Sequence, residues 1–223
     1  MPIDTGKVLS IHTGKVKEMP YGDKSITTAY QKGKVEGSIF LSKNGFQGDE
    51  HYYKGHGGLD KAVCIYSVDH YPYWEEKFGS IAEDSMFGEN LTVQGLTEED
   101  VHVGDIYEFG DAVIQITEPR GPCHIIAKRY GDKTIPLIMQ QTGWTGYYAR
   151  VLKEGMVSSG NILKRKETHE DRITILKVNE LLYKNEKDES LLHTLIGVEP
   201  LSSSLREDLQ RKAEKLKKKN ADS

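Results

Sequence analysis

The chain has 223 residues and a formal net charge of -4, from 30 Lys and Arg against 34 Asp and Glu. Its 37% hydrophobic and 29% charged residues exclude disorder throughout, and its length fits one domain with an appendage. The small negative charge disfavours nonspecific contact with a phosphate backbone, so we expect no nucleic acid polymer as partner. No apolar run reaches the length of a signal peptide core or a membrane span, which predicts a cytoplasmic protein without a membrane partner.

Up to Lys166 the sequence predicts a mainly β domain, because short β-branched runs alternate with glycine turns. We expect a hairpin in which Gly110-Asp111 joins two strands, 105–109 and 112–117. The other expected strands are 8–13, 37–42, 61–68 and 161–166, and the expected helices are 71–78, 124–130 and 134–141.

The amino-acid composition of the chain changes after residue 166, since 21 of its 22 glycines and 11 of its 12 tyrosines precede that point. From Thr174 onward apolar residues follow a helical period, which predicts three short helices. Ser204 and Glu207 fit a capping box at the start of the last helix. We therefore divide the chain into domains 1–166 and 167–223, and expect the small helical part to pack on the β domain or on another subunit, with a homodimer as the favoured assembly.

A glycine-rich segment, residues 48–63, holds the densest chemistry of the chain. Gly57 and Gly58 let the backbone approach a ligand closely, while His51, His56 and Lys61 offer donors to an anionic or polar partner. A long loop with turn glycines would have the same composition, so this segment alone leaves both interpretations open.

The second segment is Glu118-Pro119-Arg120-Gly121-Pro122-Cys123-His124, between a predicted strand and a predicted helix. This position places Cys123 near a helix N-terminus and near Arg120, both of which favour a thiolate. Cys64 stands in an apolar strand, where a cysteine is usually a small core residue. A zinc site of His51, His56, Cys64 and Cys123 is an alternative, although these residues lack the usual local zinc spacing.

Together these segments resemble the MOSC domain proteins, the family of the molybdenum cofactor sulfurase C-terminal domain, over residues 5–166. The three-helix tail is similar to that of the bacterial N-hydroxylaminopurine resistance subfamily. The resemblance implies a MOSC-like β-barrel followed by a small three-helix domain. Its motifs stand in family order: Gly48-Asp49, His56-Gly57-Gly58-Leu59-Asp60-Lys61-Ala62-Val63, Phe87-Gly88-Glu89-Asn90-Leu91, Val103-Gly104-Asp105 and Pro119-Arg120-Gly121-Pro122-Cys123.

The resemblance further implies that Cys123 is the catalytic residue, either as a ligand of molybdenum or as the carrier of a persulfide. The molybdenum cofactor, molybdopterin with its metal, bears a phosphate and a pterin edge, which need cations and hydrogen-bonding groups. The candidates by residue type are Arg120, Lys15 and Lys61 as cations, and Asn90, His51, His56, Gly57 and Gly58 as hydrogen-bonding positions.

Three functions follow as hypotheses. The first is a molybdenum-dependent reductase of N-hydroxylated bases or related N-oxygenated small molecules, with electrons from a separate flavin or iron-sulfur reductase, since the chain has only two cysteines. The second is a sulfur carrier with a persulfide on Cys123 and no redox metal. The third is a small-molecule or zinc-binding module without catalysis.

Overall fold

The computed structural model describes residues 3–53, 55, 57–79, 85–184 and 188–221. Its centre is a closed barrel of seven strands in the order β13-β9-β10-β11-β7-β8-β1, in which β1 pairs again with β13. Neighbouring barrel strands are antiparallel except for β7 and β8, which are parallel. The barrel strands are β1 (Thr5–Thr13), β7 (Val63–Ser67), β8 (Leu91–Gln94), β9 (Ile106–Phe109), β10 (Ala112–Pro119), β11 (Tyr147–Lys153) and β13 (Ile162–Glu167).

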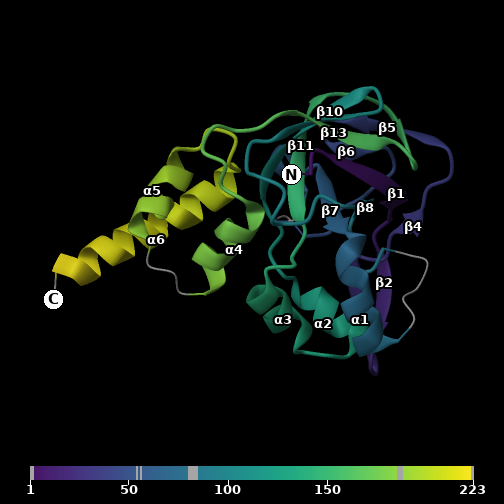
Figure 1. The fold of residues 1–223 in the computed structure, drawn as a ribbon. Helices are drawn as coiled ribbons and strands as arrows, with labels where there is room; N and C mark the ends of the chain where they lie inside the picture. Colours follow the sequence, from purple (N-terminus) through teal and green to yellow (C-terminus); the bar gives the residue numbers. More distant parts are fainter. Residues whose placement is uncertain (1–2, 54, 56, 80–84, 185–187, 222–223) are drawn as a thin grey trace.

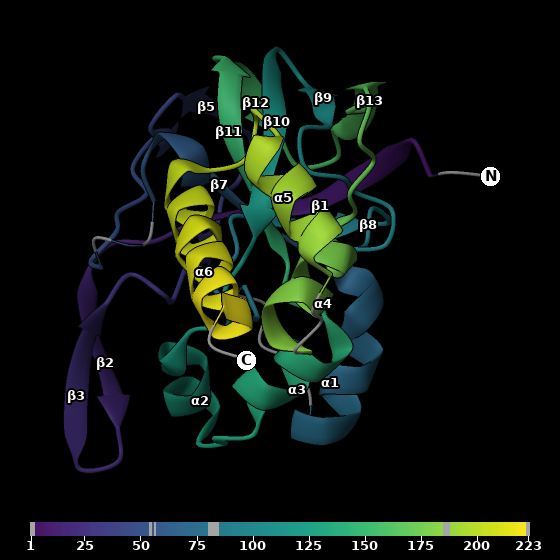
Figure 2. The ribbon, with the colours of Figure 1, turned by 90° about the vertical axis from the view of Figure 1, so that its left-hand side faces the viewer.

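Shorter strands extend this framework. β4 (Gly33–Lys34) pairs with the end of β1, and β5 (Ser38–Ser42) joins β6 (Gly45–Phe46) and β12 (Gly155–Ser158) in a small sheet. β2 (Lys17–Tyr21) and β3 (Lys24–Thr28) form a hairpin that projects from the body of the molecule (Figure 2). The sequence analysis missed this hairpin, because its strands are mostly polar and β2 contains Pro20.

The predicted hairpin around Gly110-Asp111 is confirmed, with Phe109 opposite Ala112. Gly110 has φ +55°, a conformation that favours glycine. The other predicted strands are present with shifted ends. The strand predicted at 61–68 begins only at Val63, because Leu59–Lys61 turn as a short 3-10 helix, η1, and a second one, η2, covers Val68–His70.

Three helices close one end of the barrel: α1 (Tyr71–Phe78), α2 (His124–Tyr130) and α3 (Ile135–Thr142) (Figure 1). They pack around an apolar cluster that is separate from the barrel core, and Trp74, Phe87 and Ile126 are buried in it. The first two helices have the predicted limits, and α3 begins and ends one residue later than predicted.

The three predicted C-terminal helices are α4 (Ile175–Tyr183), α5 (Glu189–Gly197) and α6 (Ser203–Ala221), which lie together on one side of the barrel (Figure 1). Apolar residues of these helices share one core cluster with barrel residues, so the helical part packs on the β domain. The division at residue 166 and a homodimer stay predictions. Among the described residues, no helix is both long and apolar enough to cross a bilayer.

The expected capping box at Ser204 is wrong in register. α6 begins at Ser203, and the Ser202 hydroxyl accepts a hydrogen bond from the Leu205 amide at 3.1 Å. Ser202 is fully buried, whereas Ser204, the predicted cap, is exposed.

Candidate functional site

A cavity of about 540 Å³, including open solvent at its mouth, lies beside β7 and the turn after β10. Five predicted site residues line it: His51, Gly57, Lys61, Asn90 and Arg120. Of the other predictions, Lys15, Gly58 and Cys123 are not among the described lining residues, and His56 lies outside the described part of the chain. The remaining lining residues are Thr28, Ala29, Tyr30, Lys32, Glu50, Tyr52, Tyr53, Cys64, Gly88, Ile125 and Tyr148.

Arg120 brings an unbalanced positive charge to the cavity wall. Its side chain is 5% exposed, and its Nη2 donates to the carbonyl of Phe87 at 2.5 Å. Its Nη1 is buried and has no hydrogen-bond partner among the described residues, nor does any described carboxylate pair with the guanidinium. A buried guanidinium in this state is suited to an anionic ligand.

Cys123 occupies the N-cap position of α2, as predicted, in an extended backbone conformation. The amide of Ile125 donates to its sulfur at 3.5 Å, and Ile125 itself lines the cavity. Cys123 is 9% exposed, and its sulfur lies within electrostatic range of the Arg120 guanidinium. The thiol therefore lies two residues from a lining residue of the cavity and close enough to Arg120 to interact with its charge.

Cys64 is buried, as predicted for a core residue, yet it also lines the cavity. Its amide donates to Asn90 Oδ1 at 3.1 Å. Burial raises the pKa of the Cys64 thiol to about 11, although the Arg120 guanidinium acts in the opposite direction. The sequence indicated the burial but not the contact with the cavity, because the orientation of a residue within a closed barrel depends on tertiary packing.

Asp49 connects two residues that line the cavity, Lys32 and Asn90. Its carboxylate accepts hydrogen bonds from the Gly14 amide at 2.7 Å and from Asn90 Nδ2 at 2.8 Å, and it pairs with Lys32 Nζ at 2.5 Å. Asn90 Nδ2 also donates to the His12 carbonyl, so both its N–H groups are used within the protein. Asn90 is therefore held in the cavity wall by hydrogen bonds from both ends of its side-chain amide.

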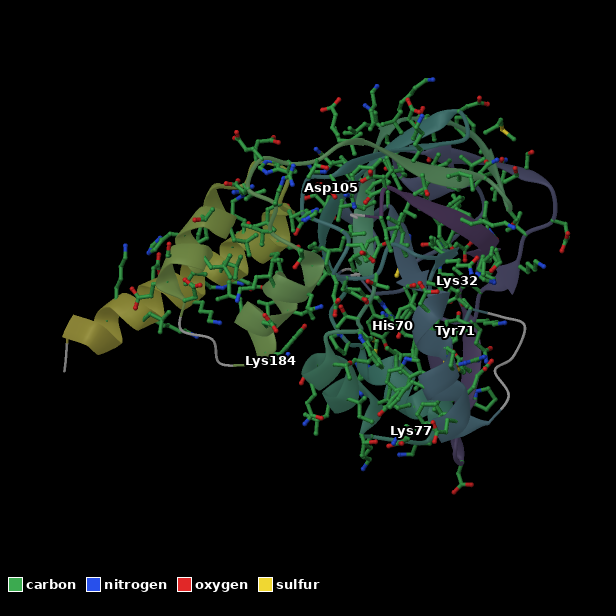
Figure 3. The ribbon with its side chains drawn as sticks, in the orientation of Figure 1. Lys32, His70, Tyr71, Lys77, Asp105 and Lys184 are labelled. Atoms are coloured by element: carbon green, nitrogen blue, oxygen red, sulfur yellow. The ribbon has the colours of Figure 1, made fainter. Side chains whose placement is uncertain are left out.

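Lys32 is a cavity residue that the sequence analysis missed. Its side chain is 6% exposed and lies on the side of the barrel away from α4–α6 (Figure 3). Lysine is among the residues that are rarely buried, and nothing in its local sequence signals burial. Only the pairing with Asp49, which is distant in sequence, explains its position.

Lys61 and Lys15 differ in their relation to the cavity. Lys61 Nζ lies 2.9 Å from Glu118 Oε1 and 5.6 Å from the centre of the Tyr148 ring. Lys15 pairs with Glu50 at 2.9 Å on the surface, with 66% of its side chain exposed. Lys61 is thus placed to act as a cavity cation, whereas Lys15 lies outside the described wall.

Gly57 allows the loop to pass closely over His51. A Cβ atom on Gly57 would lie 2.5 Å from His51 Cδ2, and its φ is +85°. Burial lowers the pKa of His51, and Lys32 adds to this effect while Asp49 opposes it. His51 is therefore a neutral hydrogen-bonding group near pH 7 and not a cation.

The segment Phe87-Gly88-Glu89-Asn90-Leu91 contributes Gly88 and Asn90 to the cavity wall. Glu89 is fully buried, and it accepts hydrogen bonds from the Tyr71 hydroxyl at 2.6 Å and the Phe87 amide at 2.8 Å. Gly88 has φ +73°, and a Cβ atom there would lie 2.9 Å from the Tyr30 ring. This segment is therefore needed for the shape of the cavity.

Within the described residues, no group of three or more His, Cys, Asp or Glu side chains is arranged to hold a metal ion. The four-residue zinc alternative includes His56, which lies outside the described residues. A cofactor whose metal takes a single cysteine ligand needs no such group.

Comparison with known proteins agrees with this geometry. The MOSC domain model matches residues 52–164. The YflK protein of Bacillus subtilis (strain 168) is 40% identical over 94% of this chain and 95% of its own length, and YiiM of Escherichia coli (strain K12) is 34% identical over 92% and 91%. The crystal structure of YiiM from Geobacillus stearothermophilus superposes with a TM-score of 0.78 at 33% identity, covering 93% of this chain and 99% of that one.

A protein of Gibberella moniliformis (strain M3125 / FGSC 7600) named "Reductase" is 33% identical over 79% of this chain, which corresponds to 32% of that longer protein. The MOSC family is associated with the molybdenum cofactor. The predicted fold and the resemblance to the N-hydroxylaminopurine resistance subfamily are thus confirmed. This chain belongs to the MOSC domain family, and its structure is similar to those of the YiiM proteins.

Proposed function

We propose that this protein binds the molybdenum cofactor through Cys123 and reduces N-hydroxylated bases or related N-oxygenated small molecules. One observation carries the proposal: the buried, unbalanced guanidinium of Arg120, with its unpartnered Nη1, stands in the cavity wall next to the Cys123 turn. The association of the family with the cofactor supports the same assignment.

The residues present fit such a group. A phosphate-bearing ligand with a thiolate-bound metal needs a soft ligand, cations and backbone that can approach closely. Cys123 provides the thiol, Arg120 an uncompensated cation, and Gly57 a backbone without a side chain in the wall. Lys61 provides a second cation, partly neutralised by Glu118.

The reaction consumes two electrons and two protons, so that an N–OH bond breaks and the products are an N–H group and water. When bound, the cofactor would supply the two-electron chemistry. Tyr148 lines the cavity, and burial raises the pKa of its hydroxyl above the usual range, although Arg120 opposes this effect. The Tyr148 hydroxyl therefore stays protonated near pH 7 and can donate a hydrogen bond to the oxygen of the N–OH group.

We propose a separate flavin or iron-sulfur reductase as the electron donor. The chain has only two cysteines, and the relative named "Reductase" extends well beyond the region that is similar to this chain. A separate reductase would supply the electrons through its own flavin or iron-sulfur group, because two cysteines are too few for an iron-sulfur cluster.

The alternative is a sulfur carrier with a persulfide on Cys123. A carrier must present its sulfur to an acceptor, whereas Cys123 is only 9% exposed. This burial favours a ligand of a cofactor held in the cavity over a carrier.

Elemental analysis tests the proposal on protein purified from cells that make the molybdenum cofactor, beside Cys123→Ser. We expect near-stoichiometric molybdenum in the native chain and its loss in the variant, followed by reduction of an N-hydroxylated base when a reductase is added. Absence of molybdenum, with a cyanide-labile sulfur on Cys123, would contradict the proposal in favour of the carrier. Zinc in place of both would support the third hypothesis.

A further inference from the structure

Arg120 is held in the cavity wall at both ends of the residue. Its amide donates to the carbonyl of Gly146 at 2.9 Å, and its Nη2 donates to the carbonyl of Phe87 at 2.5 Å. The side chain is buried and its Nη1 has no described hydrogen-bond partner, so the position of Nη1 depends on these two contacts. The placement of the Gly146 carbonyl therefore bears on the anion site.

Gly146 lies in a space that admits no side chain. Its φ is +73°, and a Cβ atom would lie 2.5 Å from the carbonyl oxygen of Ile65 and 3.0 Å from the ring of Tyr66. The Tyr66 ring in turn contacts the ring of Phe87, with 4.6 Å between the centroids. Gly146 is thus bonded to the amide of Arg120 and lies one ring away from the residue that anchors the guanidinium.

Helix α4 reaches the same carbonyl oxygen of Gly146. The Thr145 hydroxyl donates to this oxygen at 2.9 Å, and it accepts a hydrogen bond from Asn179 Nδ2 at 2.8 Å. Asn179 Nδ2 also donates to the carbonyl of Gly143 at 2.9 Å. Thr145 and Asn179 are both buried, so their polar groups depend on these partners. A continuous chain of hydrogen bonds therefore runs from Asn179 through Thr145 and the Gly146 carbonyl to the Arg120 amide.

Glu98 holds the amide of Gly146. Its Oε1 accepts a hydrogen bond from this amide at 2.7 Å, and its backbone carbonyl accepts one from the Leu176 amide of α4 at 2.8 Å. The Glu98 side chain is buried, and its Oε2 lies 2.7 Å from His70 Nε2. Helix α4 is therefore hydrogen-bonded to the residues that hold both the amide and the carbonyl of Gly146.

We infer that Thr145 and Asn179 are positioning residues for Arg120, and that α4 thereby sets the affinity of the cavity for anions. Neither residue is among the described residues that line the cavity, so both act on a bound anion through Arg120. The anion-binding half of this inference rests on the proposed function, whereas the positioning half does not.

Hydrogen exchange of the Arg120 amide tests the positioning. It is followed by NMR in the full-length native chain, Thr145→Val and Thr145→Ser, relative to the amides of β8. Valine has nearly the size of threonine but no hydroxyl, whereas serine keeps the hydroxyl. We expect the Arg120 amide to exchange about two- to tenfold faster in Thr145→Val, the range for loss of one hydrogen bond, and at nearly the native relative rate in Thr145→Ser. Thr97→Val is the control, because the Thr97 hydroxyl donates to Asp100 Oδ2 instead.

The affinity is measured on the same full-length proteins, prepared without the cofactor, with inorganic phosphate as the probe. We expect the dissociation constant to rise about two- to tenfold in Thr145→Val, in parallel with the exchange rate of the Arg120 amide. It should stay at the native value in Thr145→Ser and in Thr97→Val.

A native exchange rate of the Arg120 amide in Thr145→Val overturns the inference, as does an equal rise at Arg120 and in β8, which would indicate general unfolding. Faster exchange at Arg120 with unchanged phosphate affinity overturns the anion-binding half. If Thr145→Val does not fold, Asn179→Leu decides by the same criteria, since it removes the donor and leaves Thr145 in place. Failure of the proposed function would instead appear as native protein without molybdenum, while the exchange result stands.

Discussion

The amide of Ile125 donates a hydrogen bond to the sulfur of Cys123 at 3.5 Å, across the first turn of α2. The thiol thus has a structural partner in addition to its place at the cavity. Serine caps helices well and alanine does not. We expect the free energy of unfolding of Cys123→Ser to lie within about 1 kcal/mol of that of the native chain. We expect Cys123→Ala to be about 0.5–1 kcal/mol less stable than Cys123→Ser. Denaturant unfolding of the three proteins checks this, and a large loss in Cys123→Ser would indicate a core role for the sulfur.

Arg120→Met should separate ligand binding from stability. It removes a buried charge that no described carboxylate balances, so we expect the free energy of unfolding to change by no more than about 1 kcal/mol. The affinity for the molybdenum cofactor should fall about tenfold or more, since loss of a charge-assisted contact of this kind costs roughly 1.5–3 kcal/mol, and the molybdenum content of protein from cofactor-producing cells should fall with it. Lys15→Met is the control, because Lys15 is exposed and outside the described cavity wall. Equal molybdenum in Arg120→Met and the native chain would contradict the assignment.

Cys64 makes stability depend on pH at the alkaline end. The thiol ionises near pH 9 in the unfolded chain and at about 11 in the folded one. The unfolded state therefore loses its proton first, and stability falls as the pH rises from about 9 to 11, by roughly 2–3 kcal/mol. Buried tyrosines add to this loss, so the measurement is the difference between the native chain and Cys64→Ala. We expect this difference to change by about that amount between pH 8.5 and 11, and a difference independent of pH would contradict the burial of the thiol.

Gly57 and Gly58 provide a matched pair. Both have positive φ, at +85° and +91°, but a Cβ atom on Gly57 would meet the His51 ring whereas one on Gly58 meets no described atom within 4 Å. Gly58→Ala should cost about 1 kcal/mol of stability from backbone strain alone. Gly57→Ala should cost roughly 1–3 kcal/mol more and shift the imidazole resonances of His51 in the NMR spectrum. Equal effects of the two substitutions would show that His51 does not contact Gly57 in solution.

Local elements could be predicted from the sequence because their determinants are local. The Gly110-Asp111 turn needs a residue that tolerates positive φ between two apolar runs, and the helices follow from the spacing of their apolar residues. The order of the motifs around Gly57 and Cys123 indicated the family, and the comparisons confirm it.

The site itself depended on contacts between distant parts of the chain. Barrel closure places Thr5 opposite Lys164, and the same closure turns Cys64 toward a cavity that no local pattern signals. Lys32 is buried because Asp49 balances its charge, and Lys15, of the same residue type, stays exposed because its partner Glu50 lies at the surface. Sequence by itself thus determined most of the elements, the family and the candidate thiol, whereas the tertiary structure decided which charges face the cavity, since burial and pairing of a side chain depend on residues far away in the chain.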